Sequence, residues 1–434
     1  MKYPFLVLMA MLISACGEAQ DSSRHKSIHQ LQHEAHRDST IQQEIATVRP
    51  GIETLFADYS DSLRGRSVGV IVNHTSKDKD GVHLVDRLVN SGIAVSAIFA
   101  PEHGFRGGAA AGQHVQDGID TVSGARIYSL YGTTRKPLPE MLKRADLLLY
   151  DIQDVGARFY TYISTMGYAM QAAAEQDIPF WVLDRPDPIT GDKVGGPVLE
   201  EDFRSFVGLY PIPVRYGMTP GELARMIAGE GWLDFPNGYQ PKVIPLRGWK
   251  RGVWYDQTDL PWIAPSPNMP DLETATVYPG LCLIEGTNVS EGRGTPNPFL
   301  QIGAPWINGK RLSQELNKMR LPGVVFEPIQ FTPEEIAGKA VNPKYEGEQC
   351  GGVRIRVIDR EQFRAVATGV QILAKVQQLH PAEFQWREAA IDRLYGSDAL
   401  RIAIAQGKSI DALISSWGEE LQEFRKKRKR YLMY

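Results

Sequence analysis

Short apolar runs alternate with amphipathic stretches over residues 67–184, and this alternation limits the possible folds more than any other feature of the sequence. The runs read SVGVIVN, IAVSAIFA, DLLLYD and IPFWVLD, beginning at residues 67, 93, 146 and 178. Between them, residues 82–90, 138–144 and 160–175 carry apolar side chains at helical spacing. Strands that alternate with helices are typical of a largely parallel sheet covered by helices. We therefore predict an α/β fold with a Rossmann-like N-terminal domain.

Proline and glycine interrupt this pattern between residues 262 and 308, where a connection or a binding surface between domains is expected. A second set of elements follows, with strands expected at 324–331 and 353–359 and helices at 310–319, 361–378 and 410–430. A chain of 434 residues is long enough for two cores. We predict a Rossmann-like catalytic domain at 48–262 and a smaller C-terminal α/β domain at 263–434, with the active site in the cleft between them.

The first 47 residues predict a lipid-anchored protein. Lys2 precedes an apolar run at 4–13, and the small residues Ser14 and Ala15 come directly before Cys16. This order is typical of a lipoprotein signal peptide at 1–15, removed so that Cys16 is diacylated and anchors the protein to a membrane. An ordinary signal peptide with an incidental cysteine is the alternative. Residues 16–47 are polar and predict a flexible tether.

Residues of the tether also indicate which membrane holds the protein and whether the tether binds a metal. Gly17 stands where an aspartate would favour the inner membrane, so we expect a cell-envelope protein held in the outer membrane and facing the periplasm. Four tether histidines have helical spacing, but no fixed frame of cysteines or carboxylates accompanies them, which favours a solvated linker over a metal site. They are His25, His29, His33 and His36.

Charge and motif content narrow the function. The chain has 51 acidic and 48 basic side chains and a net charge of −3, which supplies no diffuse cationic field for a nucleic acid. The ending RKKRKR fits a helix C-terminus stabilised by cations better than a nucleic-acid patch. No G-x-G-x-x-G follows the first strand, and G-x-x-x-x-G-K-[ST] occurs nowhere, so a nucleotide is not expected. We predict no cofactor and no metal.

Polar side chains follow each of the four apolar runs. In open α/β sheets, ligands bind in the crevice at the carboxyl ends of the strands, so these residues predict one composite site. They are Asn73, Glu102, His103, Asp151, Gln153, Asp154, Asp184 and Arg185. Asn73 and Asp184 could equally be capping or turn residues. Glu102 is a poor cap in a tight turn, and a glycine-rich loop at 105–124, able to close over a ligand, emerges beside it.

Two further clusters are candidates for the same site. Arg158 and Tyr160 follow the third run, where a guanidinium suits a carboxylate and an aromatic ring suits a sugar. The proline- and glycine-rich segment presents a second group of polar residues on loops, with ordinary surface charge as the alternative interpretation. This group is Glu285, Asn288, Glu291, Arg293 and Asn297.

Five motifs, taken in order, resemble the exo-β-N-acetylmuramidases of the NamZ type, formerly a family of unknown function. They read PEHGFRG, DIQDVGARFYTY, LDRPDPITG with VGGPVLE, APSPNMP and EGTNVSEGRGTPNPF, and the resemblance covers about residues 50–434. It implies a glycosidase that removes N-acetylmuramic acid from the non-reducing ends of peptidoglycan fragments, with Glu102 as the catalytic carboxylate. Asp187 departs from the asparagine expected in this family, which weakens any role for that side chain.

Glycoside hydrolysis needs a carboxylic acid and usually a second carboxylate as nucleophile or base. Glu102 is the predicted acid, and the candidates for the second group are Asp151, Asp154, Glu285 and Glu291. Retaining and inverting routes stay open, as does attack by the substrate's own acetamido group with Asp151 or Asp154 as its orienter. Arg158, Arg185 and Arg293 are candidate partners for the lactyl carboxylate of muramic acid.

Two other functions fit the sequence. A lipid-anchored protein could capture cell-wall fragments without catalysis, using the same arginines and tyrosines. An amidase or esterase acting on peptide or acyl groups of the wall is the other alternative, although no G-x-S-x-G elbow supports a serine hydrolase. A desolvated glutamate in a tight turn suits a general acid better than a sugar binder.

Overall fold

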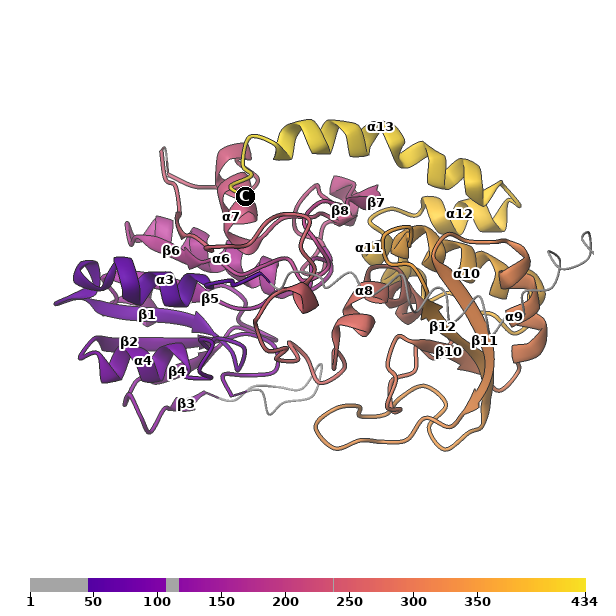
Figure 1. Ribbon diagram of the computed structural model, residues 1–434, viewed down its shortest axis with the longest axis horizontal. Coiled ribbons are helices and arrows are strands. Elements are labelled where there is room, and N and C mark those ends of the chain that lie inside the picture. Colours follow the sequence, from indigo (N-terminus) through magenta and orange to yellow (C-terminus); the bar gives the residue numbers. More distant parts are fainter. Residues whose placement is uncertain (1–45, 107–116, 237) are drawn as a thin grey trace, which may run out of the picture. The chain divides into compact units, whose positions relative to one another are not determined.

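The computed structural model describes residues 46–106, 117–236 and 238–434 (Figure 1). The predicted signal peptide, Cys16, nearly all of the predicted tether and the middle of the glycine-rich loop lie outside these described residues. Residues 46–434 form one compact unit. Within the described ranges, no helix is both long enough and apolar enough to cross a membrane.

The N-terminal half is built on a seven-stranded sheet in the order β3-β4-β2-β1-β5-β6-β9. All neighbours pair in parallel except β3 and β4, which are antiparallel. The strands are β1 (Ser67–Val72), β2 (Ala94–Ala100), β3 (Gly118–Ile119), β4 (Arg126–Ser129), β5 (Leu147–Asp151), β6 (Phe180–Leu183) and β9 (Lys242–Ile244). Without β3, the chain order across the sheet is 3-2-1-4-5-6, the doubly wound Rossmann arrangement. The predicted fold class is confirmed.

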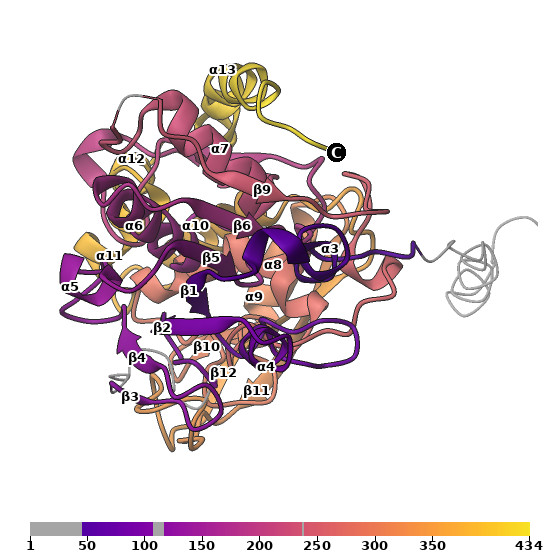
Figure 2. The same ribbon diagram turned by 90° about the vertical axis from the view of Figure 1, so that its left-hand side faces the viewer.

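Successive side chains of the central strands enter two separate cores, because residues along a strand alternate between the faces of the sheet. Val68 and Val70 pack with α3 (Gly51–Asp58) and α4 (Leu84–Asn90), whereas Ile71 packs on the opposite face. That face is covered by α6 (Tyr162–Glu175) and α7 (Pro220–Glu230), and Figure 2 shows the two helical layers. Burial on both faces explains why these strands read as continuous apolar runs.

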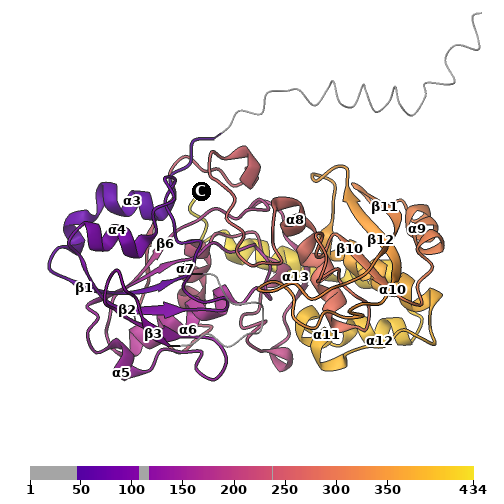
Figure 3. The same ribbon diagram turned by 90° about the horizontal axis from the view of Figure 1, so that it is seen from below.

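The C-terminal half is built on a smaller antiparallel sheet in the order β10-β12-β11 (Figure 3). Its strands are β10 (Gln301–Ala304), β11 (Val324–Phe331) and β12 (Cys350–Val357). The accompanying helices are α8 (Leu272–Leu281), α9 (Gly309–Lys318), α10 (Ala365–Leu379), α11 (Glu388–Tyr395) and α12 (Ala399–Ala405). The buried central helix α10 packs against α8 and α9. This matches the expected second α/β set, while the boundary at residues 262/263 stays a prediction.

The last helix, α13 (Ile410–Arg428), connects the two halves. It packs against α10 and α12 and also against β7 (Gly195–Val198), which forms a small sheet with β8 (Pro213–Arg215). Arg428 in the cationic ending is buried and donates to the carbonyl oxygen of Gly191 at 2.9 Å. The cationic end of α13 is therefore fixed to the N-terminal half rather than spread over a solvated face.

Candidate active site

A pocket lies at the carboxyl ends of the parallel strands, close to the point between β1 and β5 where the strand order reverses. Segments from both halves of the chain line it. The lining residues are Glu102, His103, Phe159, Tyr160, Thr161, Tyr162, Ser266, Asn268, Met269, Tyr278, Arg293 and Phe299. Ligands of open α/β sheets bind at this position. Four of the predicted site residues are therefore brought together here: Glu102, His103, Tyr160 and Arg293.

The turn after β2 presents Glu102 to the pocket. Gly104 donates to the carbonyl oxygen of Pro101 at 3.0 Å, and both His103 (φ 71°) and Gly104 (φ 76°) are left-handed. A left-handed backbone at a non-glycine residue such as His103 costs about 1 kcal/mol and is found mainly where the surrounding structure enforces it. The half-buried Glu102 is thus held in one place at the end of a buried strand.

Two hydroxyl side chains contact Glu102. Thr161 Oγ1 donates to Glu102 Oε2 at 3.1 Å, and Tyr131, which follows β4, is also a hydrogen-bond partner. Burial, and next the negative charge of Glu102, raise the pKa of Tyr131, so its hydroxyl keeps its proton and can donate. Thr161 and Tyr131 are therefore neutral donors to the carboxyl group.

Aromatic rings form a continuous wall of the pocket. Tyr278 packs edge-on against Phe159, Tyr160 and Phe299, with ring centroids 5.4, 5.8 and 4.9 Å apart. Tyr160 also packs edge-on against Tyr162 at 5.0 Å. Aromatic faces beside a carboxylate suit a sugar ring, whose C–H faces are apolar and whose edges are polar.

Arg293 is the cation of the pocket, and two predicted site residues hold it. Its Nε and Nη2 donate to Glu285 Oε1 at 3.0 and 2.7 Å, and Glu291 Oε1 lies 3.5 Å from Nε. Lys344 Nζ in turn lies 3.0 Å from Glu291 Oε2. Although burial opposes the charge, the two glutamates raise the pKa of Arg293 and keep it cationic. Glu285 and Glu291 therefore orient the arginine and do not themselves line the pocket.

Arg158 lies elsewhere, in a fully buried position. Its Nη1 donates to the carbonyl oxygens of Pro197 and Ile212 at 2.9 and 2.8 Å. Its Nη2 donates to those of Leu394 and Tyr395 at 3.0 and 2.6 Å. The guanidinium joins the N-terminal half to α11, and its donors are directed at backbone rather than at the pocket.

Asp151 and Arg185 form a buried ion pair with one another at the end of β5. Arg185 Nε and Nη2 donate to the two carboxylate oxygens of Asp151 at 2.5 and 2.9 Å, and both residues are buried. Gln153 Nε2 donates to the carbonyl oxygens of Asp154 and Pro186 at 2.8 and 2.9 Å. None of these side chains lines the pocket.

Asp154 is buried and hydrogen-bonded to protein groups. Its Oδ2 accepts from the Tyr216 hydroxyl and from the Gly156 N–H. Burial raises the pKa of Asp154 to about 6 in spite of these two donors.

Asn73 forms a turn at the end of β1. Its Oδ1 accepts from both the N–H and the hydroxyl of Thr75, at 2.9 and 2.6 Å. These contacts support the interpretation of Asn73 as a turn residue.

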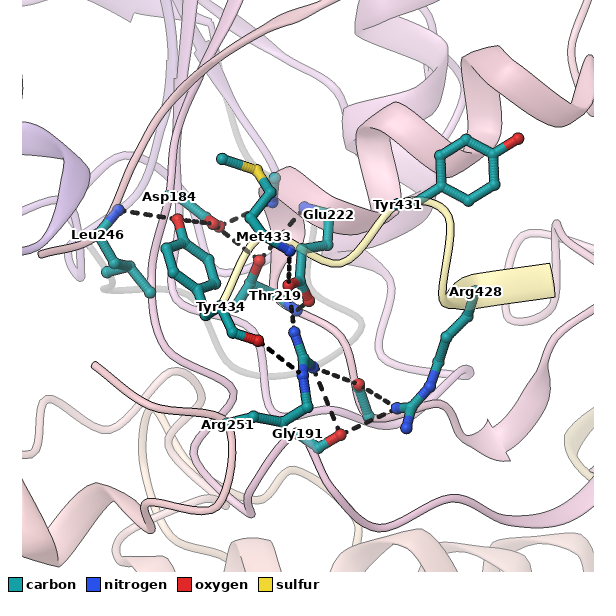
Figure 4. A network of polar contacts seen from close by, with 12 residues as sticks. Asp184, Gly191, Thr219, Glu222, Leu246, Arg251, Arg428, Tyr431, Met433 and Tyr434 are labelled. Atoms are coloured by element: carbon teal, nitrogen blue, oxygen red, sulfur yellow. Dashed lines mark hydrogen bonds and ion pairs between the residues drawn. The ribbon is translucent and has the colours of Figure 1, made fainter. Parts of the chain in front are cut away.

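Asp184 anchors the end of the chain, as Figure 4 shows. Its Oδ1 accepts from the N–H groups of Arg185 and Gly221 at 3.0 and 2.7 Å. Its Oδ2 accepts from the hydroxyls of Thr219 and Tyr434 at 2.7 and 2.8 Å. These four donors occupy the carboxylate, so the geometry supports the capping alternative for Asp184.

Two asparagines of the C-terminal half also bind backbone or protein side chains. Asn288 donates to the carbonyl oxygen of Glu383 at 2.8 Å and accepts from the N–H of Gln385 at 2.9 Å. Asn297 Oδ1 accepts from Arg354 Nη2 at 3.1 Å. Within the described ranges, no cluster of histidine, cysteine, aspartate and glutamate could hold a metal ion.

Several residues in or beside the pocket were not predicted from the sequence. Thr161 and Tyr131 contact Glu102, and Asn268 belongs to the APSPNMP motif, for which the sequence indicated no site residue. Tyr278 and Phe299 complete the aromatic wall from the C-terminal half. The available signal was the position of Asn268 and Phe299 inside motifs that carry the family resemblance.

Fold and site together define a two-domain α/β protein of the Rossmann class, whose pocket combines a carboxylate with aromatic rings and one cation. Family models for the N-terminal and C-terminal parts of the exo-β-N-acetylmuramidase NamZ match residues 68–273 and 276–434. The chain belongs to this family, which confirms the resemblance in the sequence.

Individual relatives support the same assignment. The chain is 46% identical over 389 residues to the peptidoglycan β-N-acetylmuramidase NamZ of Bacillus subtilis (strain 168), covering 89% of this chain and 91% of that protein. Two solved DUF1343 family structures from Bacteroides fragilis are 36% identical, with TM-scores of 0.81 and 0.73. Each match covers 89% of this chain and 99% of the solved chain.

Proposed function

We propose that this protein is an exo-acting β-N-acetylmuramidase that releases N-acetylmuramic acid from the non-reducing ends of peptidoglycan fragments. Membership of the NamZ family supports the reaction class. The observation that carries the chemistry is Glu102, held by Thr161 and Tyr131 in a pocket with an aromatic wall and Arg293. Glu102 donates its proton to the glycosidic oxygen, and Arg293 binds the lactyl carboxylate.

The absence of a second carboxylate in the lining favours help from the substrate. Among the described residues, Glu102 is the one carboxylate that lines the pocket, and residues 107–116 contain neither aspartate nor glutamate. The carbonyl oxygen of the 2-acetamido group is therefore the proposed nucleophile. It attacks C1 while Glu102 protonates the leaving oxygen, and an oxazolinium ion forms. Glu102 then takes a proton from the water that opens this ring, so the anomeric configuration is retained.

The reaction is tested with the β-1,4-linked MurNAc–GlcNAc disaccharide. Wild-type protein should release N-acetylmuramic acid, and Glu102→Gln should lower kcat by at least about 100-fold, as expected for loss of a general acid. Glu140→Gln, the same change at an exposed position of α5 (Pro139–Leu142), is the matched control. Equal release by wild type and Glu102→Gln would move the chemistry to another group. Binding without release by the wild type would favour the capture protein.

The acetamido route has its own tests. NMR of the first product should show the β-anomer, and a trifluoroacetamido substrate, whose carbonyl oxygen is a weaker nucleophile, should react more slowly. Inversion of configuration would contradict the route while leaving the exo-muramidase proposal intact.

We also propose that Cys16 is lipidated and that the protein works in the cell envelope, at the outer membrane facing the periplasm. The apolar run at 4–13 and the small residues before Cys16 support this. Metabolic labelling with a radioactive fatty acid should mark the wild type and not Cys16→Ser, and fractionation should find the labelled protein with outer membranes. An unlabelled but exported protein would indicate the ordinary signal peptide.

A further inference from the structure

A second, wider hollow lies away from the active-site pocket, where the β7–β8 segment faces α10 and α13. This groove has a volume of about 720 Å³ and shares no lining residue with the pocket. Six charged residues line it, and cations outnumber carboxylates by four to two. They are Lys193, Arg215, Arg364, Arg425, Asp192 and Glu361.

The N-terminus of the 15-residue helix α10 faces this groove. Ala365, Val366 and Ala367 in the first turn line it, and no side chain of the described residues caps their N–H groups. The first turn contains no acidic residue, and the N-cap position is held by exposed Arg364. The N-terminal end of a helix carries a partial positive charge and unpaired N–H donors. A cation at this end is therefore repelled unless an anion lies between them.

Arg215 provides an independent indication of a missing acceptor. It lines the groove at the end of β8, is only 5% exposed, and its buried Nε has no hydrogen-bond partner among the described residues. Its Nη2 donates to the carbonyl oxygen of Ile189. Asp187 and Glu361 are the carboxylates that act on it electrostatically, yet burial still lowers the pKa of Arg215 to about 10. Since this Nε is itself shielded from solvent, an anion in the groove would reach the guanidinium through Nη1, which has no hydrogen-bond acceptor among the described residues.

Asp187 offsets part of the charge of Arg215 from outside the lining, but the remaining charges of the groove still leave a positive excess. Lys193 Nζ lies 3.1 Å from Glu361 Oε2, and Glu361 Oε1 accepts from the Trp254 indole N–H at 2.6 Å, so these two residues largely neutralise one another. Arg425 Nη2 makes one long contact of 3.4 Å with the carbonyl oxygen of Val194. Asp192 is the other carboxylate of the lining, against Arg215, Arg364 and Arg425.

We propose that this groove binds a phosphate group, either as inorganic phosphate or as a phosphate monoester. Its oxygens would accept from the first-turn N–H groups of α10, and Arg364, Arg425 and Arg215 would balance its charge. A tetrahedral dianion matches both the ring of N–H donors at a helix N-terminus and the arginine fork. The proposal is independent of the muramidase activity, because the two hollows have separate linings.

Calorimetric titration of the full chain with inorganic phosphate, at constant ionic strength in chloride, tests the site. The wild type should bind one phosphate saturably, and Arg364→Glu should weaken binding at least tenfold. Arg356→Glu is the matched control, because Arg356 is exposed on β12, does not line the groove, and undergoes the same change of charge. Arg425→Gln should weaken binding less than Arg364→Glu, and it guards against misfolding of the first variant.

Four outcomes would overturn the proposal. The first is no saturable phosphate binding by the wild type, and the second is unchanged binding by both Arg364→Glu and Arg425→Gln. In the third, Arg293→Gln would abolish phosphate binding, which would place the anion in the active-site pocket. A parallel titration with glucose 6-phosphate shows whether a phosphate monoester binds more tightly than inorganic phosphate. In the fourth outcome, acetate would bind more tightly than phosphate, which would assign the groove to carboxylates.

Discussion

The C-terminal tyrosine allows a quantitative test of how the end of the chain stabilises the N-terminal half. The Tyr434 hydroxyl donates to Asp184 Oδ2 at 2.8 Å and accepts from the Leu246 N–H at 2.9 Å. Burial, reinforced by Glu222, raises the pKa of Asp184 to about 7. Its carboxyl group is therefore ionised in the folded protein at pH 8.5 and protonated at pH 5.

This difference in ionisation sets the size of the effect. A hydrogen bond to a charged group contributes about 1.5–3 kcal/mol, against about 0.5–1.5 kcal/mol for a neutral one, and an orphaned buried N–H costs at least about 1 kcal/mol. Tyr434→Phe should therefore lower the free energy of unfolding by about 3 kcal/mol at pH 8.5 and by about 2 kcal/mol at pH 5. The larger loss at high pH is the signature of a donor to the ionised carboxylate.

The wild type has a pH dependence of its own at this site. Because the folded-state pKa of Asp184 lies above the ordinary value of 3.8, the unfolded chain binds fewer protons than the folded chain between roughly pH 4 and pH 7. The contribution of Asp184 to stability is thus fully present below about pH 4 and is lost as the pH rises through 7.

Urea unfolding followed by circular dichroism at pH 5 and pH 8.5 measures both effects. Tyr431→Phe is the matched control, because its hydroxyl donates to Glu230 at 2.6 Å in a more exposed part of the same tail. It should cost less than about 1 kcal/mol. Equal losses for Tyr434→Phe at the two pH values, or an equal loss for Tyr431→Phe, would refute the reasoning.

Three further predictions concern the pocket and the interface between the halves. Thr161→Val should lower kcat about tenfold with little change in KM, because it removes a donor to Glu102. The control Thr165→Val, one turn later in α6, should leave kcat unchanged, and steady-state kinetics of the two variants test this. Arg293→Lys should raise KM for muramic-acid substrates at least about tenfold and leave KM for N-acetylglucosaminides unchanged. If the variant prefers muramic-acid substrates as strongly as the wild type does, Arg293 does not bind the lactyl carboxylate. Arg158→Met should lower stability by about 3–5 kcal/mol, because four buried carbonyl oxygens lose their donor; an unchanged melting temperature would contradict this.

The fold was predictable where burial is uniform. The strands β1, β2, β5 and β6 are buried between two helical layers, and therefore stand out as apolar runs. The edge-side strand β4 reads RIYS and the edge strand β9 reads KVI, and both are short and partly exposed. Such strands are defined by pairing with a neighbour rather than by their own pattern, so the sequence did not reveal them.

The site was predictable only in part, because the position of a polar residue does not give the direction of its side chain. Glu102, placed at the end of a buried strand in a turn with no capping role, does line the pocket. Asp151 and Asp184 also follow buried strands, yet their oxygens bind Arg185 and the Thr219–Tyr434 pair. A carboxylate at the end of a strand can face a pocket or bind neighbouring protein groups, and only its tertiary contacts show which of the two it does.

The N-terminus of α4 explains why the usual phosphate site of a Rossmann sheet is closed here. After β1, a dinucleotide-binding protein leaves the next helix N-terminus open for a pyrophosphate. In this protein His83 caps α4 by accepting from the Val85 N–H at 3.2 Å, while its Nε2 bonds the Asn73 carbonyl oxygen at 2.9 Å. Burial lowers the pKa of His83 to about 4, so the ring is neutral and its Nδ1 remains an acceptor at physiological pH.

The closed end of α4 leaves the neighbouring crevice to Glu102 and Thr161, beside hydroxyl groups and aromatic rings. The aromatic wall suits a sugar ring, and Arg293 suits a carboxylate on that sugar. The N-terminus of α10 also has no side-chain cap, and the groove in front of it carries the excess of arginines that a phosphate requires. Capping alone does not separate the two hollows, because α6, whose N-cap Thr161 lines the pocket, also lacks a side-chain cap. The charged side chains of the linings separate them, since the pocket pairs Glu102 with Arg293 whereas the groove has four cations and two carboxylates.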